Sequence, residues 1–197
     1  QKLVKFAKFG FWGVIGGFIF LFIILPLMAF GLPSPDKIVR QEGFSTKIQD
    51  RNGEVLYDIY SDKRQTPIKL DSVPLYLRQA TIAIEDKNFY AHSGFDPIGM
   101  LRGFTRIFTK GRAQGGSTLT QQLVKNVLLT SERSVYRKVK EFVLAVQIEK
   151  KYSKDEILQM YLNEAPYGGT AWGVESASEI YFGKKVADLT LTESAFL

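Results

Sequence analysis

The sequence predicts a mainly α-helical domain that carries a small β-hairpin and follows one transmembrane helix. Three observations support this fold class. No charged residue lies between Phe9 and Pro35, and the chain after Pro74 is a succession of apolar patterns with helical spacing. Between these regions, an Asn-Gly pair at 52–53 separates two short segments of strand-like composition, which is typical of a hairpin.

The uncharged stretch predicts a transmembrane helix over residues 9–32, preceded by a cytoplasmic tail of residues 1–8. A bilayer core requires about 20 apolar residues, and within lipid only a helix satisfies every backbone group of a single span. Lysines but no acids precede the stretch, so the positive-inside rule places the N-terminus in the cytoplasm and the rest of the chain outside. A cleaved signal peptide is the alternative, but its apolar segment would be only about 7–15 residues long.

Residues 33–72 are expected to form a linker with the hairpin at about 44–60, and residues 73–197 to form the helical domain. The expected helices of that domain are 75–89, 96–111, 117–129, 134–152, 153–165, 173–183 and one that begins near residue 191, inside which the chain stops. Expected caps are Asp71 or Ser72, Ser117 or Thr118, and a capping box of Ser153 with Glu156. Expected core residues are Leu75, Leu77, Ala80, Ile82 and Ile84 in the first helix, and Val135, Val139, Phe142, Val143 and Val146 in the fourth.

The charge balance argues against a nucleic-acid partner. The formal net charge is +6, and half of it comes from the three lysines before the apolar stretch, so the rest of the chain is only mildly basic. Any anion-binding site must therefore rest on local clusters. The chain has no cysteine, so disulfides play no part.

The stretch "IAIEDKNFYAHSGFD" brings together Glu85, Asp86, Asp96 and the only histidine, His92. Neighbouring residues on a helix point about 100° apart, so Glu85 and Asp86 do not face each other as a carboxylate pair. The spacing matches no metal signature. One interpretation is structural, a helix end at which His92 hydrogen-bonds the backbone or Asp96. The other is that Glu85, partly buried at the end of an apolar helix face, acts as a general base.

A second cluster, "QGGSTLTQQLVK", places hydroxyls and amides at a helix start, where backbone N–H groups favour anions. The alternative is a flexible loop before an ordinary helix, and the phosphate-binding spacing of a P-loop is absent. A third cluster, "ERSVYRKVKE", aligns Arg133, Arg137, Lys140 and Glu141 on one helix face. This face is either a solvated surface with an Arg137–Glu141 pair or, together with Lys125 from the preceding helix, a site for a diphosphate.

Four motifs in order, "EDKNFYAHSGFD", "GGSTLTQQ", "RKVKE" and "KDEILQMYLN", resemble the peptidoglycan glycosyltransferase family (glycosyltransferase family 51). That family occurs in class A penicillin-binding proteins and monofunctional transglycosylases. The resemblance runs from about Val73 to the chain end and implies a lysozyme-like helical glycosyltransferase domain. It implies a reaction in which lipid II is polymerised into glycan strands, with inversion at the anomeric carbon and release of a polyprenyl diphosphate.

The resemblance also implies roles for particular residues. Glu85 matches the catalytic base that deprotonates the acceptor hydroxyl, and Glu141 matches a second essential carboxylate near the donor diphosphate. The expected substrate-binding residues are Asp86, Phe89, His92, Arg102, Ser117, Thr118, Gln121, Gln122, Lys125, Arg133, Arg137, Lys138 and Lys140. The reaction needs a base for a weak nucleophile and cations for a charged leaving group. A divalent cation, Mg²⁺ or Mn²⁺, could also neutralise the diphosphate, and the sequence does not decide between the cation and the basic side chains.

Two other functions remain as alternatives: a lytic enzyme that cleaves glycan on a lysozyme-like fold, and a non-catalytic, membrane-tethered glycan-binding module. If the chain is a glycosyltransferase, its expected partners are lipid II, the growing lipid-linked glycan chain and the bacterial plasma membrane. Proteins of cell division or elongation are further candidate partners. The chain lacks the Ser-x-Asn and Lys-Thr-Gly motifs of a penicillin-binding transpeptidase domain. It also stops inside a helix that the family continues, so a fragment of a longer protein is expected.

Overall fold

The computed structural model describes residues 11–13, 15–18, 23, 27, 31–39, 46–53, 55–59, 64–97, 99, 116–129 and 134–197. The tail 1–8, most of the predicted span 9–32 and nearly all of the predicted helix 96–111 lie outside these residues, as do Arg102 and Arg133. In the part of the chain that is described, no helix combines the length and the apolar character needed to cross a membrane.

The described elements confirm a mainly helical domain with small sheets. The α-helices are α3 (Leu75–Glu85), α5 (Leu119–Val127), α6 (Val135–Lys151), α7 (Lys154–Glu164), α8 (Val174–Phe182) and α9 (Leu191–Phe196). Short 3₁₀ helices are η2 (Pro35–Ile38), η3 (Leu70–Ser72) and η4 (Val186–Asp188). The strands are β1 (Thr46–Gln49), β2 (Val55–Ile59), β3 (Arg64–Gln65), β4 (Pro166–Gly168) and β5 (Ala171–Trp172).

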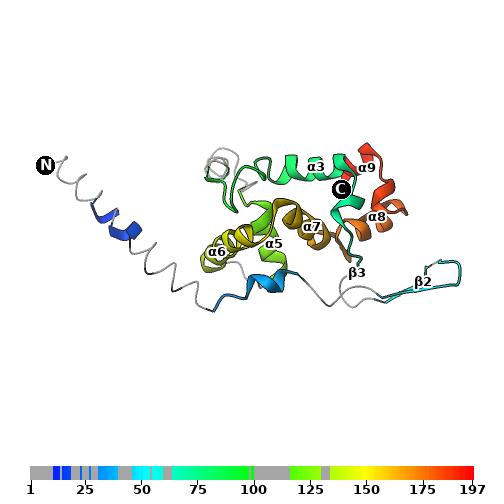
Figure 1. The fold of residues 1–197 in the computed structure, drawn as a ribbon, viewed down its shortest axis with the longest axis horizontal. Helices are drawn as coiled ribbons and strands as arrows, with labels where there is room; N and C mark the ends of the chain where they lie inside the picture. Colours follow the sequence, from blue (N-terminus) through cyan, green and yellow to red (C-terminus); the bar gives the residue numbers. More distant parts are fainter. Residues whose placement is uncertain are drawn as a thin grey trace.

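The predicted hairpin is confirmed. Strands β1 and β2 pair antiparallel, with Ile48 opposite Tyr57. The Asp50 carboxylate accepts a hydrogen bond from the Asn52 backbone N–H at 2.8 Å, and Gly53 adopts a φ of 87° that suits a residue without a side chain. Figure 1 shows this hairpin extending away from the helical body.

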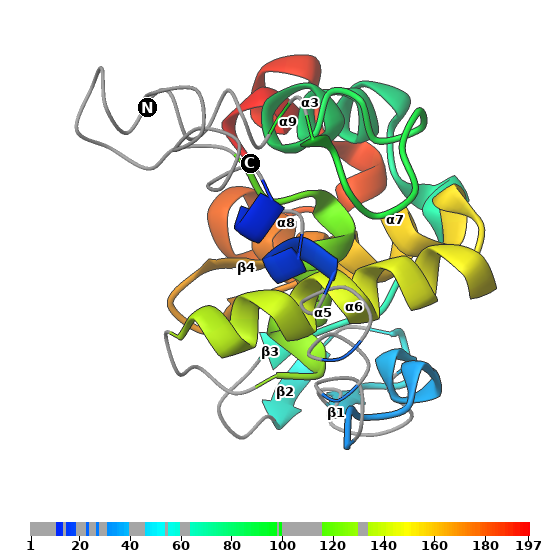
Figure 2. The same cartoon turned by 90° about the vertical axis from the view of Figure 1, so that its left-hand side faces the viewer.

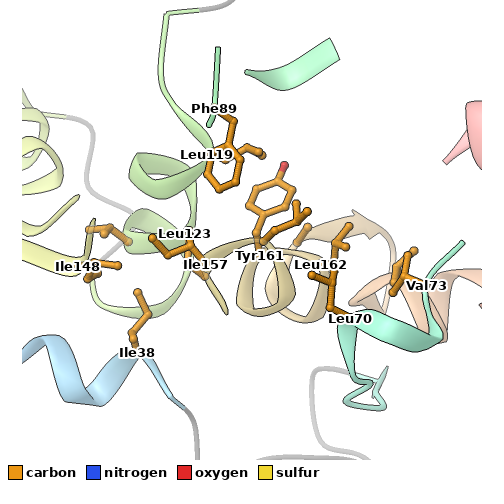
Figure 3. Packing of buried hydrophobic residues seen from close by; sticks show 14 of the residues in the cluster. Ile38, Leu70, Val73, Phe89, Leu119, Leu123, Ile148, Ile157, Tyr161 and Leu162 are labelled. Carbon is orange, nitrogen blue, oxygen red and sulfur yellow. The ribbon is translucent and has the colours of Figure 1, made fainter. Parts of the chain in front are cut away.

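The core lies where α5 packs against both α6 and α7 (Figures 1 and 2). Figure 3 shows the packed side chains, which include Leu119 and Leu123 of α5 and Leu162 of α7. Ile38, only 1% exposed, joins this core from η2, so a segment of the predicted linker is packed into the domain. Helix α9 lies beside α3 along one side of the body.

Two of the three predicted helix caps are confirmed, and Ser134 adds a cap that was not predicted. Thr118 caps α5, Ser134 caps α6, and Ser153 with Glu156 forms the predicted capping box of α7. The expected caps Asp71 and Ser72 are wrong, because both residues belong to η3 and Pro74 occupies the N-cap of α3 without a side-chain hydrogen bond.

The predicted core residues of α3 and α6 are partly wrong. In α3 only Leu77 is buried, while Leu75 is 62% exposed and Ile84 is 82% exposed. In α6 the most deeply buried apolar residues are Leu144, Ala145 and Ile148, and Val135 in the first turn is 84% exposed. Each helix packs against the body through a narrower face than its apolar residues cover, so the apolar residues outside that face stay exposed.

The sequence did not predict the three-stranded sheet, whose order is β3-β5-β4. Arg64 of β3 pairs in parallel with Ala171 of β5, far along the chain. Strands of two or three residues leave no periodic pattern in a sequence. The sheet nevertheless fixes the turn after α7, which carries part of the site described next.

Candidate active site

Glu85 lies between two neighbouring cavities. It is the last residue of α3, and it lines a first cavity of about 500 Å³ and a second cavity of about 240 Å³. The first cavity is also lined by Ala80, Thr81, Ile84, Gln122, Lys125, Asn126, Tyr161, Ala165, Pro166, Tyr167 and residues 194–197. The second is also lined by Ala83, Ile84, Asp86, Lys87, Asp96, Gly99 and residues 116–118. The two cavities therefore follow α5, from its N-cap to its last turn, on either side of one carboxylate.

The expected partial burial of Glu85 is wrong, because the residue is exposed at the end of its helix. Its carboxylate is nevertheless held in place. The Gln122 amide Nε2 donates a hydrogen bond to Oε2 of Glu85 at 2.8 Å. A carboxylate that faces open cavities is accessible to a substrate hydroxyl, which a general base requires.

Asp86 and Glu85 contact different partners, as expected, but the helical angle is not the reason, because α3 ends at Glu85 and Asp86 is its C-cap with a non-helical φ of −157° and ψ of 74°. Asp86 is buried, and its Oδ2 accepts a hydrogen bond from the Leu119 backbone N–H at 3.0 Å, at the start of α5. His92 Nε2 lies 2.9 Å from the same oxygen. His92 therefore makes a structural hydrogen bond at the helix end, as one interpretation expected. Its partner is Asp86 rather than the expected backbone or Asp96. Asp86 and His92 together tie the turn after α3 to α5.

The same turn approaches α6 closely at Gly94. This glycine has a φ of 81°, and a Cβ at its position would lie 2.9 Å from both the carbonyl carbon and the oxygen of Ala145. Its own carbonyl accepts hydrogen bonds from Thr118 Oγ1 at 3.0 Å and from Gln121 Nε2 at 3.3 Å. Thr118 and Gln121, which were expected to bind substrate, thus hold the turn, and Thr118 also lines the second cavity.

Phe89 is fully buried and belongs to the core rather than to a cavity wall. The Lys154 ammonium lies 4.5 Å from the centre of its ring, and the same ammonium pairs with Glu149 at 2.6 Å. Phe89 therefore anchors the turn from beneath. Its expected role in contacting substrate is not one that a buried ring can serve directly.

Glu141 is buried and joins the basic face of α6. Its Oε1 lies 3.0 Å from Arg137 Nε, and its Oε2 lies 2.6 Å from Lys138 Nζ. Lys138 Nζ also donates to Ser117 Oγ at 2.6 Å, which brings this face to the edge of the second cavity. The predicted Arg137–Glu141 pair is present, but it is a buried anchor for two cations rather than a solvated surface pair.

Three further lysines near the site differ in their surroundings. Lys140 Nζ lies 4.2 Å from the centre of the Tyr136 ring, and Lys125 is exposed on the wall of the first cavity. Lys87, which was not singled out in the sequence, is exposed on the wall of the second cavity. Positive side chains thus flank Glu85 on both sides.

Two tyrosines complete the first cavity and were missed in the sequence. Tyr161 lies in α7 and Tyr167 in β4, and each lines the cavity beside Glu85. Burial, and next the charge of Glu85, raise the pKa of both phenols well above the ordinary value. Tyr161 was missed because an aromatic residue in an amphipathic helix is usually a core residue. Tyr167 was missed because its strand is too short to be recognised in a sequence.

No metal site is formed by the described residues, since they include no group of three or more His, Cys, Asp or Glu side chains placed to hold an ion. Glu141 is already paired with two cations, and Asp86 with His92 and a backbone N–H. This donor set does not fit a metal held by the protein alone.

Comparisons with known proteins give one family model and a set of similar proteins. The model of the transglycosylase family matches residues 52–197. Penicillin-binding protein 1F of Bacillus subtilis (strain 168) is 44% identical over 154 residues, which cover 78% of this chain and 21% of that protein. Penicillin-binding protein 1A of Escherichia coli (strain K12) is 45% identical over 152 residues, covering 77% and 18%. Penicillin-binding protein 1A of Aquifex aeolicus (strain VF5) is 38% identical over 193 residues, covering 94% and 26%. The chain spans about a fifth to a quarter of the length of these relatives.

Proposed function

The chain belongs to the transglycosylase family, and from this premise we propose that its helical domain is a peptidoglycan glycosyltransferase that polymerises lipid II. The observation that carries the proposal is the position of Glu85 between two cavities. A glycosyl transfer joins two large substrates at one bond. It therefore needs two binding spaces that meet at one base.

In this reaction Glu85 accepts the proton of the acceptor hydroxyl at carbon four. The freed oxygen attacks the anomeric carbon of the growing chain, and the bond from that carbon to the polyprenyl diphosphate breaks. A new glycosidic bond forms with inverted configuration, and the diphosphate leaves with the electron pair. The Oε1 atom of Glu85 takes the proton, because Oε2 accepts the hydrogen bond from Gln122.

The leaving diphosphate needs neutralisation rather than a proton. Lys138 at the edge of the second cavity and Lys125 on the wall of the first are suited to this role. Glu141 serves it indirectly, because its two oxygens hold Arg137 and Lys138 at fixed positions. Arg102, Arg133 and Lys140 remain proposed contacts of the same kind. A Mg²⁺ or Mn²⁺ ion would reach the site as a counter-ion of the diphosphate, and no step in this proposal depends on it.

Both substrates are lipid-linked, so the domain should work at a membrane surface. We propose that residues 9–32 anchor it in the bacterial plasma membrane, with residues 1–8 in the cytoplasm and residues 73–197 outside. Proteins of cell division or elongation are the partners that such a location favours. Alkaline phosphatase fused after Arg40 would be active in this orientation and inactive in the opposite one.

The test of the activity uses the whole chain, labelled lipid II and preformed glycan. Polymer formed from lipid II, with preformed glycan left intact, is the expected result. Shortening of preformed glycan would instead indicate a lytic enzyme, and no change in either substrate would indicate a glycan-binding module. Repeating the assay with a chelator shows whether a divalent cation contributes.

A further inference from the structure

Glu85 is connected to Tyr161 through a single side chain. Gln122 Nε2 donates to Oε2 of Glu85 at 2.8 Å, and the Tyr161 hydroxyl donates to Gln122 Oε1 at 3.4 Å. The three residues come from α3, α5 and α7, and all three line the first cavity. Two ends of one amide are thus held by different helices.

The order of donors along this connection is fixed by charge. A carboxylate only accepts hydrogen bonds, so the amide must turn its NH₂ group towards Glu85 and its oxygen towards Tyr161. The Tyr161 phenol must then be the donor. Burial and the nearby Glu85 charge raise its pKa, so the hydroxyl keeps the proton that it donates. With the hydroxyl removed, the amide is held at one end only.

We infer that Tyr161 is a positioning residue that acts through Gln122 to fix the Glu85 carboxylate, leaving Oε1 to face the acceptor hydroxyl. Glu85 is exposed at a helix end, where a carboxylate otherwise rotates among several rotamers. Tyr161 provides a rigid support, because it is 7% exposed and belongs to the packed hydrophobic core shown in Figure 3. The inference rests on the proposed function, since it assigns Glu85 as the base.

Two properties separate this role from a merely structural one. Loss of the Tyr161 hydroxyl should lower kcat and leave KM nearly unchanged, because the hydroxyl holds the base and not the substrate. Loss of the Tyr161 hydroxyl should also have no effect on kcat in a variant that lacks the Gln122 amide, because the hydroxyl is then no longer connected to Glu85. Residues that act in series are coupled in this way, whereas independent residues give additive losses.

The experiment is a double-mutant cycle on lipid II polymerisation with the whole chain. Tyr161→Phe removes only the hydroxyl, and Gln122→Met removes both polar atoms of the amide while keeping its length. We expect Tyr161→Phe to lower kcat about tenfold, since small misplacements of a catalytic group cost up to about 100-fold. We expect the double variant to be no slower than Gln122→Met alone.

The matched control is Tyr76→Phe, which removes another partly buried tyrosine hydroxyl, one that donates to the Leu189 carbonyl away from Gln122. Its thermal unfolding gives the stability cost of such a loss, and its kcat should match the wild type. Additive losses in the cycle, or a kcat for Tyr161→Phe equal to that of Tyr76→Phe, would overturn the inference. Failure of the wild type to polymerise lipid II would refute the proposed function itself, so the two outcomes are distinguishable.

Discussion

Replacing Glu141 with glutamine tests whether this buried carboxylate holds the cations of the site. The side chain is 2% exposed and pairs with Arg137 at 3.0 Å and with Lys138 at 2.6 Å. The contact with Lys138 is a hydrogen bond to a charged group, which contributes about 1.5–3 kcal/mol, and the contact with Arg137 is an ion pair. Lys138 is 48% exposed, so water replaces much of the contact that it loses. Arg137 is 20% exposed, so little water replaces the charge of Glu141 and most of the stabilisation from that pair is lost. The free energy of unfolding should therefore fall by about 2–3 kcal/mol, below the roughly 3–5 kcal/mol of a fully buried pair.

For a domain of this size, 1 kcal/mol corresponds to about 2–4 °C, so the melting temperature should fall by about 4–12 °C. Polymerisation by the folded fraction should fall by about 100-fold, because both cations lose their anchor. The assays are thermal unfolding followed by circular dichroism and initial rates on labelled lipid II at a temperature where the variant remains folded.

The matched control is Glu149→Gln on the same helix. The Glu149 carboxylate is 3% exposed, pairs with Lys154 at 2.6 Å and accepts from Thr120 at 2.6 Å, yet it lines neither cavity. We expect a similar loss of stability with the activity of the folded fraction retained. Equal losses of activity in the two variants would refute the reasoning, since Glu141 would then act only through stability.

Three further predictions concern stability. Ile38→Ala empties a position that is 1% exposed and should cost about 2–5 kcal/mol in urea unfolding, whereas Val39→Ala, at 49% exposure, should change little. Gly94→Ala should lower the free energy of unfolding by about 1–3 kcal/mol, because the φ of Gly94 is 81° and the new Cβ meets an α6 carbonyl. An unchanged free energy of unfolding would contradict this and show that the turn adapts to the Cβ. The Lys184 ammonium, followed by the helix N-cap, lowers the pKa of Glu193 to about 2. Its stabilisation is thus present above pH 4.5 and lost towards pH 2, so the melting-temperature gap to Glu193→Gln should close over that range and a constant gap would contradict it.

Local signals in the sequence were enough for the hairpin, for most helices and for the caps of α5 and α7, but not for the cap of α3. The Asn-Gly turn, Thr118, and the pair of Ser153 with Glu156 act within a few residues, so the structure repeats what the sequence predicts. Burial was harder to predict, because it depends on which face of a helix meets the body. Ile84 has an apolar side chain, yet it lines both cavities beside Glu85.

The candidate site shows the same division. The motif order pointed to Glu85, which lines both cavities, and to Glu141, which pairs with two cations, and their catalytic roles stay predictions. Contacts between distant segments left no such signal. The partner of His92 is set by how the turn folds back, and the approach of Tyr161 to Gln122 is set by the packing of α7 against α5.

The most direct test of the central claim is the rate of lipid II polymerisation by Glu85→Gln, measured beside the wild type and Glu149→Gln with the whole chain at equal folded fraction. Glutamine keeps the size of the side chain but cannot accept the hydroxyl proton as a carboxylate does. We expect polymer from the wild type and from Glu149→Gln, and none above background from Glu85→Gln. Polymerisation by Glu85→Gln at the wild-type rate would contradict the assignment of Glu85 as the base.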